Sequence, residues 1–514
     1  MLVGDLLHKS ASRMPDSVAL IGHNRRITYS EFDGHSNQLA NALLGLGLEK
    51  GTKIAVLSRN CPAYAIAYYA IARTPYVSVH CSTRMVASEL AYVLNKTEVD
   101  VLLLESRFSQ LVADALSEIH KAPQLILLDQ EPGINGAVSM REFAASMPTT
   151  APDVSTSEVD DLAITMTGGT TGMPKAVLVS HKSRCASAEA AAQEFGLDDN
   201  DIVLASTPLF HSAGLFVWLG TAVSQGATVV FPGNWDPAEF VDIVEQEKIT
   251  AAFLVPSQLN DLVSHADFST ERLRTLRNIS YAGAPMGKAM FERIRHALPA
   301  ISFTENYGQS EACPITIRRF DAGEEKAATV GKAACNAEVG IVDDEGTLLP
   351  AGEIGDIVTR GDQVFTEYFN DPQETAAAFV LPDGWLQTGD IGFLDDDGYL
   401  TLVDRSKDML VSGAENVYPA EIENALYEHE AVEECAVFGI PHERWGEVPA
   451  AHIVLAANKT VTEEELIEYC AKRIARFKRP RSIRFVTSLP KTAVGKVRKN
   501  ELRAPYWEGR ERPI

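Results

Sequence analysis

One stretch of the sequence, TMTGGTTGMPKAVLVSH at residues 165–181, combines residue types that can hold an anion. It contains three glycines, five hydroxyl side chains and one lysine, next to the apolar runs LAI and AVLV. The backbone N–H groups of a glycine-rich loop can converge on phosphate oxygens, and hydroxyl and ammonium groups add further donors. Because such a loop is also common as a surface turn, this stretch alone leaves both interpretations open.

The stretch differs from the P-loop, in which a lysine directly follows the second glycine and a helix begins. Here Met173 and Pro174 separate Gly172 from Lys175, and the residues that follow, AVLVSH, are typical of a strand. The sequence therefore predicts a phosphate loop between two strands.

Further segments carry residues that could do chemistry. They are a histidine in STPLFHSAG (206–214), a carboxylate in NYGQSE (306–311), another in WLQTGD (385–390), and a lysine in PKTAVGKVRK (490–499). Each has an ordinary alternative explanation as a buried histidine, a turn or a solvated charged run. Their order along one chain is more informative than any one of them.

Taken in that order, the segments resemble the signatures of the adenylate-forming (AMP-binding) superfamily, of the acyl-CoA or aryl-CoA synthetase type. TGGTTGMPK resembles its phosphate loop, YAGAP (281–285) resembles an adenine segment, and the resemblance covers essentially the whole chain. It implies an ATP-dependent acid–thiol ligase. Such an enzyme joins a carboxylic acid to ATP as an acyl-adenylate with release of pyrophosphate, and then forms the CoA thioester with release of AMP.

The resemblance implies a role for most residues of the ATP site. Lys496 would bridge the substrate carboxylate and the α-phosphate, Glu311 would bind Mg²⁺, Lys175 would hold phosphate, and His211 would gate the acyl pocket; these four are the expected catalytic residues. Gly168 departs from the family, in which many members have serine. The residues expected to contact ATP or AMP are Thr167, Gly168, Gly169, Thr170, Thr171, Gly283, Ala284, Pro285, Asn306, Tyr307, Ser310, Asp390 and Arg405.

The resemblance also implies a small domain that turns about a hinge at Lys407 between the two half-reactions. The basic end of the chain suits a second polyanion, CoA, because residues 471–514 hold 14 Lys and Arg against 3 Asp and Glu. Gly413 lacks a side chain, so a narrow pantetheine tunnel can pass it, although Ala414 follows where the family usually has glycine. The residues expected near CoA are Arg84, Ser412, Gly413, Trp445, Phe477 and Lys478.

The segment 206–219, STPLFHSAGLFVWL, contains no acidic residue to pair with an α-ammonium group. We therefore expect a hydrophobic carboxylic acid, aliphatic or aromatic, rather than an amino acid. Other functions stay open: an adenylating enzyme that loads a separate carrier protein, an enzyme that retains one half-reaction, a luciferase-like oxygenase, and a non-catalytic nucleotide sensor.

Alternating helix and strand patterns predict an α/β fold whose parallel-rich sheets are flanked by helices. Short strands with Asp-Gly turns predict a small β unit at about 335–404 within a large N-terminal domain, 1–404. New helix–strand alternation predicts a small, mobile α+β domain at 405–514.

Composition narrows the class of protein. The net charge of −24 disfavours nucleic acid as a partner. No apolar run approaches the roughly 18 residues of a membrane span, and the N-terminus lacks the apolar core of a signal peptide. Seven cysteines without a CxxC pair suit a reducing cytosol rather than a disulfide framework or a zinc site, so we expect a cytoplasmic enzyme. A homodimer stays open.

Overall fold

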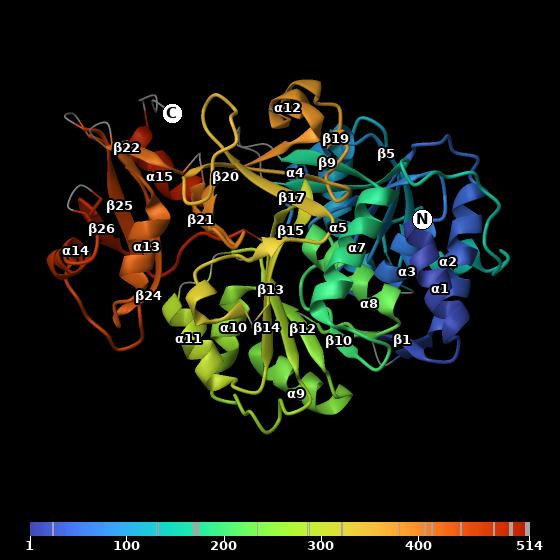
Figure 1. Ribbon diagram of the computed structural model, residues 1–514. Helices are drawn as coiled ribbons and strands as arrows, with labels where there is room; N and C mark the ends of the chain where they lie inside the picture. The colour runs from blue at the N-terminus through green and yellow to red at the C-terminus, as the bar shows by residue number, and fades with distance from the viewer. Residues whose placement is uncertain are drawn as a thin grey trace.

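The computed structural model describes the chain except residues 23–24, 130, 132, 168–173, 234, 285, 287, 320–321, 380, 406–407, 413–414, 443–444, 476–477, 493–496 and 509–514. The described elements form two large sheets, a smaller antiparallel sheet and a C-terminal α/β unit (Figure 1).

The first large sheet has eight strands. Six of them, from β7 to β8, run parallel, whereas β9 is antiparallel to both β8 and β19. In spatial order the strands are β19 (Glu367–Tyr368), β9 (Lys175–Ser180), β8 (Asp161–Thr167), β4 (Val77–His80), β3 (Lys53–Leu57), β5 (Val99–Leu104), β6 (Gln124–Leu127) and β7 (Val138–Ser139).

The second large sheet has nine strands, with a parallel centre and antiparallel strands at both edges. In spatial order they are β16 (Lys332–Ala333), β15 (Ala312–Arg319), β14 (Ser302–Gln309), β13 (Asn278–Ala282), β12 (Ala251–Leu254), β10 (Ile202–Leu204), β11 (Thr228–Val230), β1 (Val18–Gly22) and β2 (Arg25–Thr28).

Successive residues of a strand point to opposite faces of its sheet, and both large sheets bury both faces. In β3, Ile54 and Val56 join the largest core, whereas Ala55 and Leu57 join a second one. In β12, Phe253 joins the largest core and its neighbours enter a third. The near-continuous apolar strands of the sequence are explained by this double burial.

Helices cover the sheets, and local sequence sets several of their ends. The helix α2 (Tyr29–Leu44) begins at a capping box in which Thr28 and Glu31 each bond the backbone of the other. The remaining helices of the large sheets are α1 (Val3–Arg13), α3 (Pro62–Ile71), α4 (Ala87–Lys96), α5 (Ser109–Ala115), α6 (Met140–Ala144), α7 (His181–Phe195), α8 (Gly220–Gln225), α9 (Pro237–Glu247), α10 (Pro256–Ser264), α11 (Lys288–Ala297) and α12 (Pro372–Ala378).

The expected small β unit is present as an antiparallel sheet in which β17 (Ala337–Val342), β18 (Gly355–Gly361), β20 (Leu386–Leu394) and β21 (Leu400–Arg405) are neighbours. One part of the range 335–404 behaves differently. The strand β19 leaves this sheet and pairs with β9, with Tyr368 opposite Val177. This pairing brings β19 and the helix α12 that follows it to the edge of the first large sheet (Figure 1).

The C-terminal elements gather at one end of the molecule (Figure 1). They have a hydrophobic core of their own, which includes Leu410, Ile422 and Leu466. The elements are β22 (Leu410–Ser412), β23 (Glu415–Val417), α13 (Pro419–Tyr427), β24 (Val432–His442), β25 (Gly446–Leu455), α14 (Glu463–Ala471), β26 (Ser482–Phe485) and α15 (Lys499–Trp507). The predicted fold class is confirmed. The domain boundary at 404/405 stays a prediction, and the expected hinge, Lys407, lies outside the described residues.

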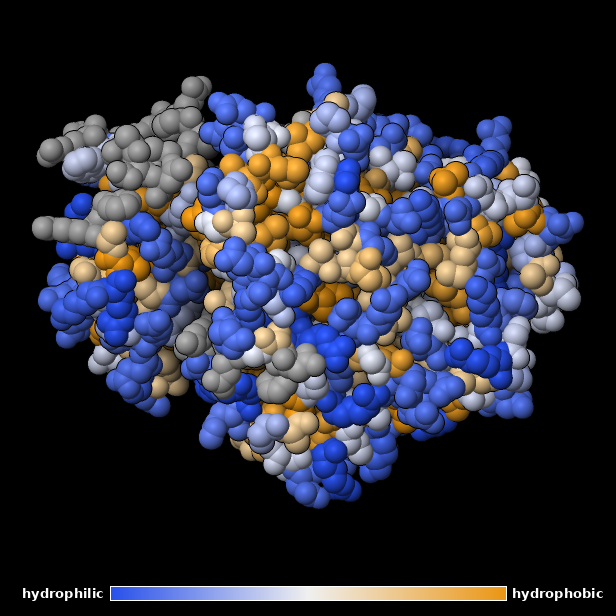
Figure 2. Space-filling model, in the orientation of Figure 1, coloured by the Kyte–Doolittle hydropathy of each residue, from blue (hydrophilic) through white to orange (hydrophobic). Residues whose placement is uncertain are grey.

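On the face shown in Figure 2, hydrophilic residues predominate and apolar residues form separate areas. None of the helices in the described part of the chain is long and apolar enough to cross a membrane. All seven cysteines are free thiols, and six of them are buried.

Candidate active site

The strands β8 and β9 lead into and out of the glycine-rich loop. They are antiparallel, and Thr167 at the end of β8 lies opposite Lys175 at the start of β9. The two strands expected on either side of this stretch are therefore present. Gly168, Gly169, Thr170 and Thr171 lie outside the described residues.

Lys175 lies between two side chains from the β19–α12 segment. Its Nζ is 2.5 Å from Oε2 of Glu374, which belongs to the first turn of α12. It also lies 4.6 Å from the centre of the Tyr368 ring. The lysine is thus held by a carboxylate and by an aromatic face, which both favour a cation.

Glu311 lies at a tight turn between β14 and β15, where Gln309 pairs with Ala312 across two residues, Ser310 and Glu311. The turn buries Glu311, which is 6% exposed. Its Oε1 accepts a hydrogen bond of 2.8 Å from the Tyr368 hydroxyl, and its backbone oxygen accepts another of 2.7 Å from the Phe365 N–H. Burial and the nearby Glu311 carboxylate raise the pKa of Tyr368, so its hydroxyl stays a donor.

Tyr307 lies in β14 only two residues before Gln309, near the same turn, and its hydroxyl contacts Asp390 of β20. The Tyr307 hydroxyl donates to Oδ2 of Asp390 over 2.7 Å, and the Asp390 N–H donates to Oγ1 of Thr388 over 3.1 Å. Asp390 lies opposite Arg405 in the pairing of β20 with β21. The side chain of Arg405 lies outside the described part of the structure.

The expected adenine edge is formed by the neighbouring ends of β13 and β14, where Ala282 pairs with Asn306. Gly283 follows with φ of +94°, a conformation that side chains rarely adopt, so the backbone turns away sharply before Ala284. Oδ1 of Asn306 is buried and has no hydrogen-bond partner among the described residues. Pro285 lies outside them.

His211 immediately precedes an unusual helix. Residues Ala213–Leu219 form a π-helix, a rare form that is frequently found at functional sites. Gly214 is needed there, because a Cβ at this position would lie 2.5 Å from the backbone oxygen of Pro208. The His211 ring packs against Phe210 at 4.7 Å between ring centres.

Direct contacts therefore join Lys175 through Tyr368 to the Glu311 turn, and Tyr307 to Asp390. Comparison with known proteins identifies the family. The family described as AMP-binding enzyme matches residues 7–369, and its C-terminal domain matches residues 421–496. This chain belongs to the AMP-binding enzyme family.

The sequences of known relatives align with this family member over almost their whole length. It is 32% identical over 507 residues to a long-chain-fatty-acid–CoA ligase, FadD13, from Mycobacterium tuberculosis, with 98% of each chain covered. It is 34% identical over 510 residues to an indoleacetate–CoA ligase from Aromatoleum aromaticum, again with 98% of each covered. The solved structure of the anthranilate CoA ligase AuaEII with anthranoyl-AMP is 27% identical and matches with a TM-score of 0.91, covering 98% of this chain and 97% of that one.

The residues expected near CoA in this AMP-binding enzyme lie on several elements. Arg84 is exposed in the segment before α4, and Ser412 is buried at the end of β22, opposite Gly446. Trp445 is 37% exposed, and Lys478 pairs with Glu421 of α13 at 2.7 Å. Gly413, Phe477 and Lys496 lie outside the described residues, so a common CoA site stays a prediction.

Sequence reasoning missed Tyr368 and Glu374, although both contact residues that it had selected. The signal was present in EYFNDPQET, where a tyrosine precedes an Asp-Pro helix start. Nothing in that pattern says that β19 would leave the small β sheet. The pairing with β9, which places Tyr368 beside Lys175, is a long-range contact between residues 177 and 368.

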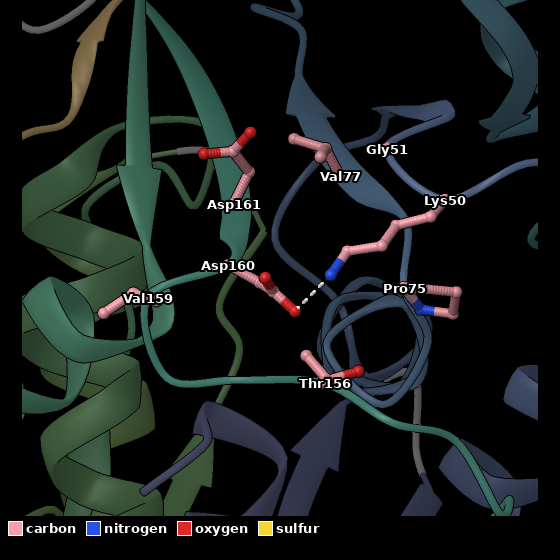
Figure 3. Close-up of a pocket in the computed structure, with 8 residues that line it drawn as sticks. All are labelled: Lys50, Gly51, Pro75, Val77, Thr156, Val159, Asp160 and Asp161. Carbon is pink, nitrogen blue, oxygen red and sulfur yellow. Dashed lines mark hydrogen bonds and ion pairs between the residues drawn. The ribbon is translucent and has the colours of Figure 1, made fainter.

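A crevice of about 160 Å³ lies elsewhere in this enzyme, where Lys50 pairs with Asp160 at 2.7 Å (Figure 3). Asp161, which also lines it, begins β8, whereas Thr167 ends the same strand. A strand rises about 3.3 Å per residue, so roughly 20 Å separates this crevice from the phosphate loop. The crevice is therefore not part of the candidate active site.

Proposed function

We propose that this chain is an AMP-forming acid–CoA ligase that converts a hydrophobic carboxylic acid and ATP into an acyl-adenylate and pyrophosphate. It then transfers the acyl group to the thiol of CoA and releases AMP. The observation that supports this most is the contact path from Lys175 through Tyr368 to Glu311. This path joins the phosphate-loop strand to the turn that carries the expected metal ligand.

In this proposal Thr167, Lys175 and the loop between them hold the phosphates of ATP. Positioning and charge neutralisation supply most of the catalysis in reactions of this kind. Lys496 adds a positive charge between the substrate carboxylate and the α-phosphate, which offsets their repulsion.

Glu311 would hold Mg²⁺. A carboxylate is the kind of ligand that this hard cation prefers, and the Tyr368 hydroxyl leaves the carboxylate in a fixed orientation. Bound Mg²⁺ would neutralise charge on the phosphate oxygens. The protein itself contributes the buried turn and the hydrogen bond that orient Glu311.

Asp390 would accept hydrogen bonds from the ribose hydroxyls, with Arg405 beside it on the paired strand. Asn306 offers a buried acceptor for the exocyclic amino group of adenine, because its Oδ1 has no partner among the described residues. Gly283 and Ala284 leave a narrow backbone edge next to it.

The acyl group would enter near His211 and the π-helix, whose residues are mainly apolar. The relatives named above act on fatty acids and indoleacetate, which favours an apolar acid here. CoA would be bound by Arg84 and Lys478 after rotation about Lys407. A cytoplasmic location and a homodimer stay predictions.

A panel of fatty, aryl and arylacetic acids tests the proposal. Each acid is incubated with ATP, Mg²⁺ and CoA, and AMP, pyrophosphate and thioester are measured. We expect AMP and thioester in equal amounts for at least one apolar acid. Pyrophosphate exchange without any thioester would favour loading of a carrier protein or a single half-reaction instead. Absence of both for every acid would contradict the proposal.

A further inference from the structure

One side chain, Tyr368, contacts both charged residues that the proposed function assigns to the metal and the phosphates. Its hydroxyl donates to Oε1 of Glu311 over 2.8 Å. The face of its ring lies 4.6 Å from Nζ of Lys175. The two contacts use different parts of the residue, so they can be removed separately.

The protein fixes Tyr368 from several sides. The residue is 8% exposed, its backbone pairs with Val177 of β9, and its N–H donates to the hydroxyl of Thr375 over 3.0 Å. Its ring packs edge-on against Phe365, 4.9 Å between ring centres. A side chain held this firmly can orient the groups that it touches.

Glu374 would compete with the phosphates of ATP for Lys175. Its carboxylate lies 2.5 Å from Nζ of Lys175, and both side chains are partly exposed, at 36% and 19%. A phosphate oxygen of ATP would carry the same kind of charge as this carboxylate. Lys175 must therefore exchange Glu374 for the nucleotide, or share its three N–H donors between them.

We propose, on the basis of the proposed function, that Tyr368 is a positioning residue for ATP activation. Its hydroxyl orients Glu311 toward the metal, and its ring holds Lys175 at the phosphates. Glu374 forms an ion pair with Lys175 until ATP binds. The three residues Tyr368, Lys175 and Glu374 set the affinity for ATP, whereas the hydroxyl of Tyr368 sets the metal requirement.

Two substitutions separate the contacts. Tyr368→Phe keeps the ring and removes the donor to Glu311. It should raise the Mg²⁺ concentration for half-maximal pyrophosphate exchange about tenfold. A change of this size corresponds to the loss of one hydrogen bond to a charged group. It should leave the KM for ATP at saturating Mg²⁺ within about twofold. Tyr368→Leu removes the ring as well, and should raise that KM about threefold or more.

Glu374→Gln should act in the opposite direction on ATP alone. Loss of the competing carboxylate should lower the KM for ATP about two- to fivefold, since partly exposed ion pairs are worth little more than that. The Mg²⁺ requirement should not change.

Binding measurements give a readout that does not depend on turnover. Calorimetry of ATP without divalent cation should show weaker binding by Tyr368→Leu and tighter binding by Glu374→Gln. Electron paramagnetic resonance of Mn²⁺ in the presence of ATP should show weaker metal binding by Tyr368→Phe.

Tyr399 provides a matched control, because Lys326 and Lys332 lie over its ring at 4.7 Å in another part of the fold. Tyr399→Phe should change neither quantity.

The inference would be overturned if Tyr368→Phe left the Mg²⁺ requirement and Mn²⁺ binding unchanged. It would also be overturned if the variant lowered every kinetic constant equally, because that result indicates only a structural role. If Tyr368→Leu does not fold, Tyr368→Phe and Glu374→Gln carry the test. A wild-type protein that exchanges no pyrophosphate and binds no ATP would overturn the proposed function together with this inference. Normal wild-type exchange with unchanged variants would overturn the inference alone.

Discussion

The hydroxyl of Tyr307 lies 2.7 Å from Oδ2 of Asp390 and donates a hydrogen bond to it. This contact joins β14 of the second large sheet to β20 of the small β sheet. It fixes one oxygen of the carboxylate that we assign to the ribose, so the nucleotide meets a preoriented acceptor.

Tyr307→Phe should therefore weaken ATP binding with little change in kcat. We expect the KM for ATP in pyrophosphate exchange to rise about three- to tenfold, the worth of one hydrogen bond to a charged group. Asp390→Asn should raise the KM for ATP further than Tyr307→Phe, because it removes the negative charge of the carboxylate. A KM for ATP that stays within experimental error in both variants would contradict the assignment.

Lys496 is expected to act only in the first half-reaction. Lys496→Ala should reduce pyrophosphate exchange by at least about a hundredfold, in line with the loss of a preorganised charge at the reacting groups. Thioester formation from a supplied acyl-adenylate and CoA should stay within about twofold of the wild type. Equal loss of both activities would assign Lys496 to both steps.

Lys499 and Glu423 form a partly buried ion pair in the C-terminal unit, three residues after Lys496. Nζ of Lys499 lies 2.8 Å from Oε1 of Glu423 in α13, and both side chains are 17% exposed. Burial disfavours the ammonium group, but the carboxylates of Glu423, Asp408 and Asp404 outweigh it and raise the pKa of Lys499.

Removing Lys499 leaves the Glu423 carboxylate without its cation, which costs up to about 3 kcal/mol for a pair that is only partly buried. We expect Lys499→Met to lower the thermal unfolding temperature of the C-terminal unit, measured by calorimetry. Lys472→Met is the matched control, because Lys472 pairs with Glu468 on the surface of the same unit. A drop no larger than that of the control would contradict the prediction.

His181 predicts a pH dependence of stability. Burial lowers its pKa from 6.5 to about 4, and its Nδ1 accepts a hydrogen bond of 3.2 Å from the Val3 N–H. The folded state thus requires the neutral ring. Its contribution is complete above pH 6.5 and is lost as the pH falls toward 4, because the unfolded chain takes up the proton first.

The loss reaches at most about 1.4 kcal/mol per pH unit from this group. His181→Asn keeps an acceptor for Val3 but cannot titrate, so urea unfolding should depend less steeply on pH between 6.5 and 4. His35→Asn, at an exposed position, is the control. An unchanged slope in His181→Asn would exclude His181 as the source.

A buried network holds the strands behind the adenine edge. Glu305 accepts from Arg318 over 2.5 Å and from the Tyr281 hydroxyl over 3.0 Å. Glu305→Leu should destabilise the protein by about 3–5 kcal/mol, because it leaves the arginine charge unpaired. The double substitution Glu305→Leu with Arg318→Met should recover much of this loss, as measured by thermal unfolding. No recovery would mean that the cost comes from packing.

Local patterns predicted most of the fold. The alternation of helices and buried strands predicted parallel-rich sheets covered on both faces, because strands buried on both faces read as continuous apolar runs. The glycine and hydroxyl content after Thr167 made a phosphate loop one of two interpretations, and AVLVSH predicted the strand that follows it. Glu311 and Asp390 were found only because their segments resemble family signatures. Their residue types alone are equally typical of turns.

The sequence could not predict which residues these groups would contact. Tyr368 and Lys175 are brought together by the pairing of β19 with β9, and Tyr307 and Asp390 by packing between two sheets. Such contacts depend on how segments that are distant in the sequence pack in the folded protein. No local sequence pattern predicts that packing. The same holds for Lys499, which lies in the basic C-terminal run of the sequence and pairs with Glu423 in the structure.

The departure of β19 from its own sheet has a practical consequence for hybrid enzymes built from this chain and a relative. Exchanging residues 335–405 as a block would import a foreign tyrosine and a foreign helix into contact with the native Lys175 and Glu311. Crossovers placed just before residue 367 and just after residue 378 would take this segment from the same parent enzyme as the glycine-rich loop. The contacts between Tyr368, Lys175 and Glu311 would then be kept. Recombination boundaries should therefore follow hydrogen-bonded neighbours rather than the visible edges of the small sheet.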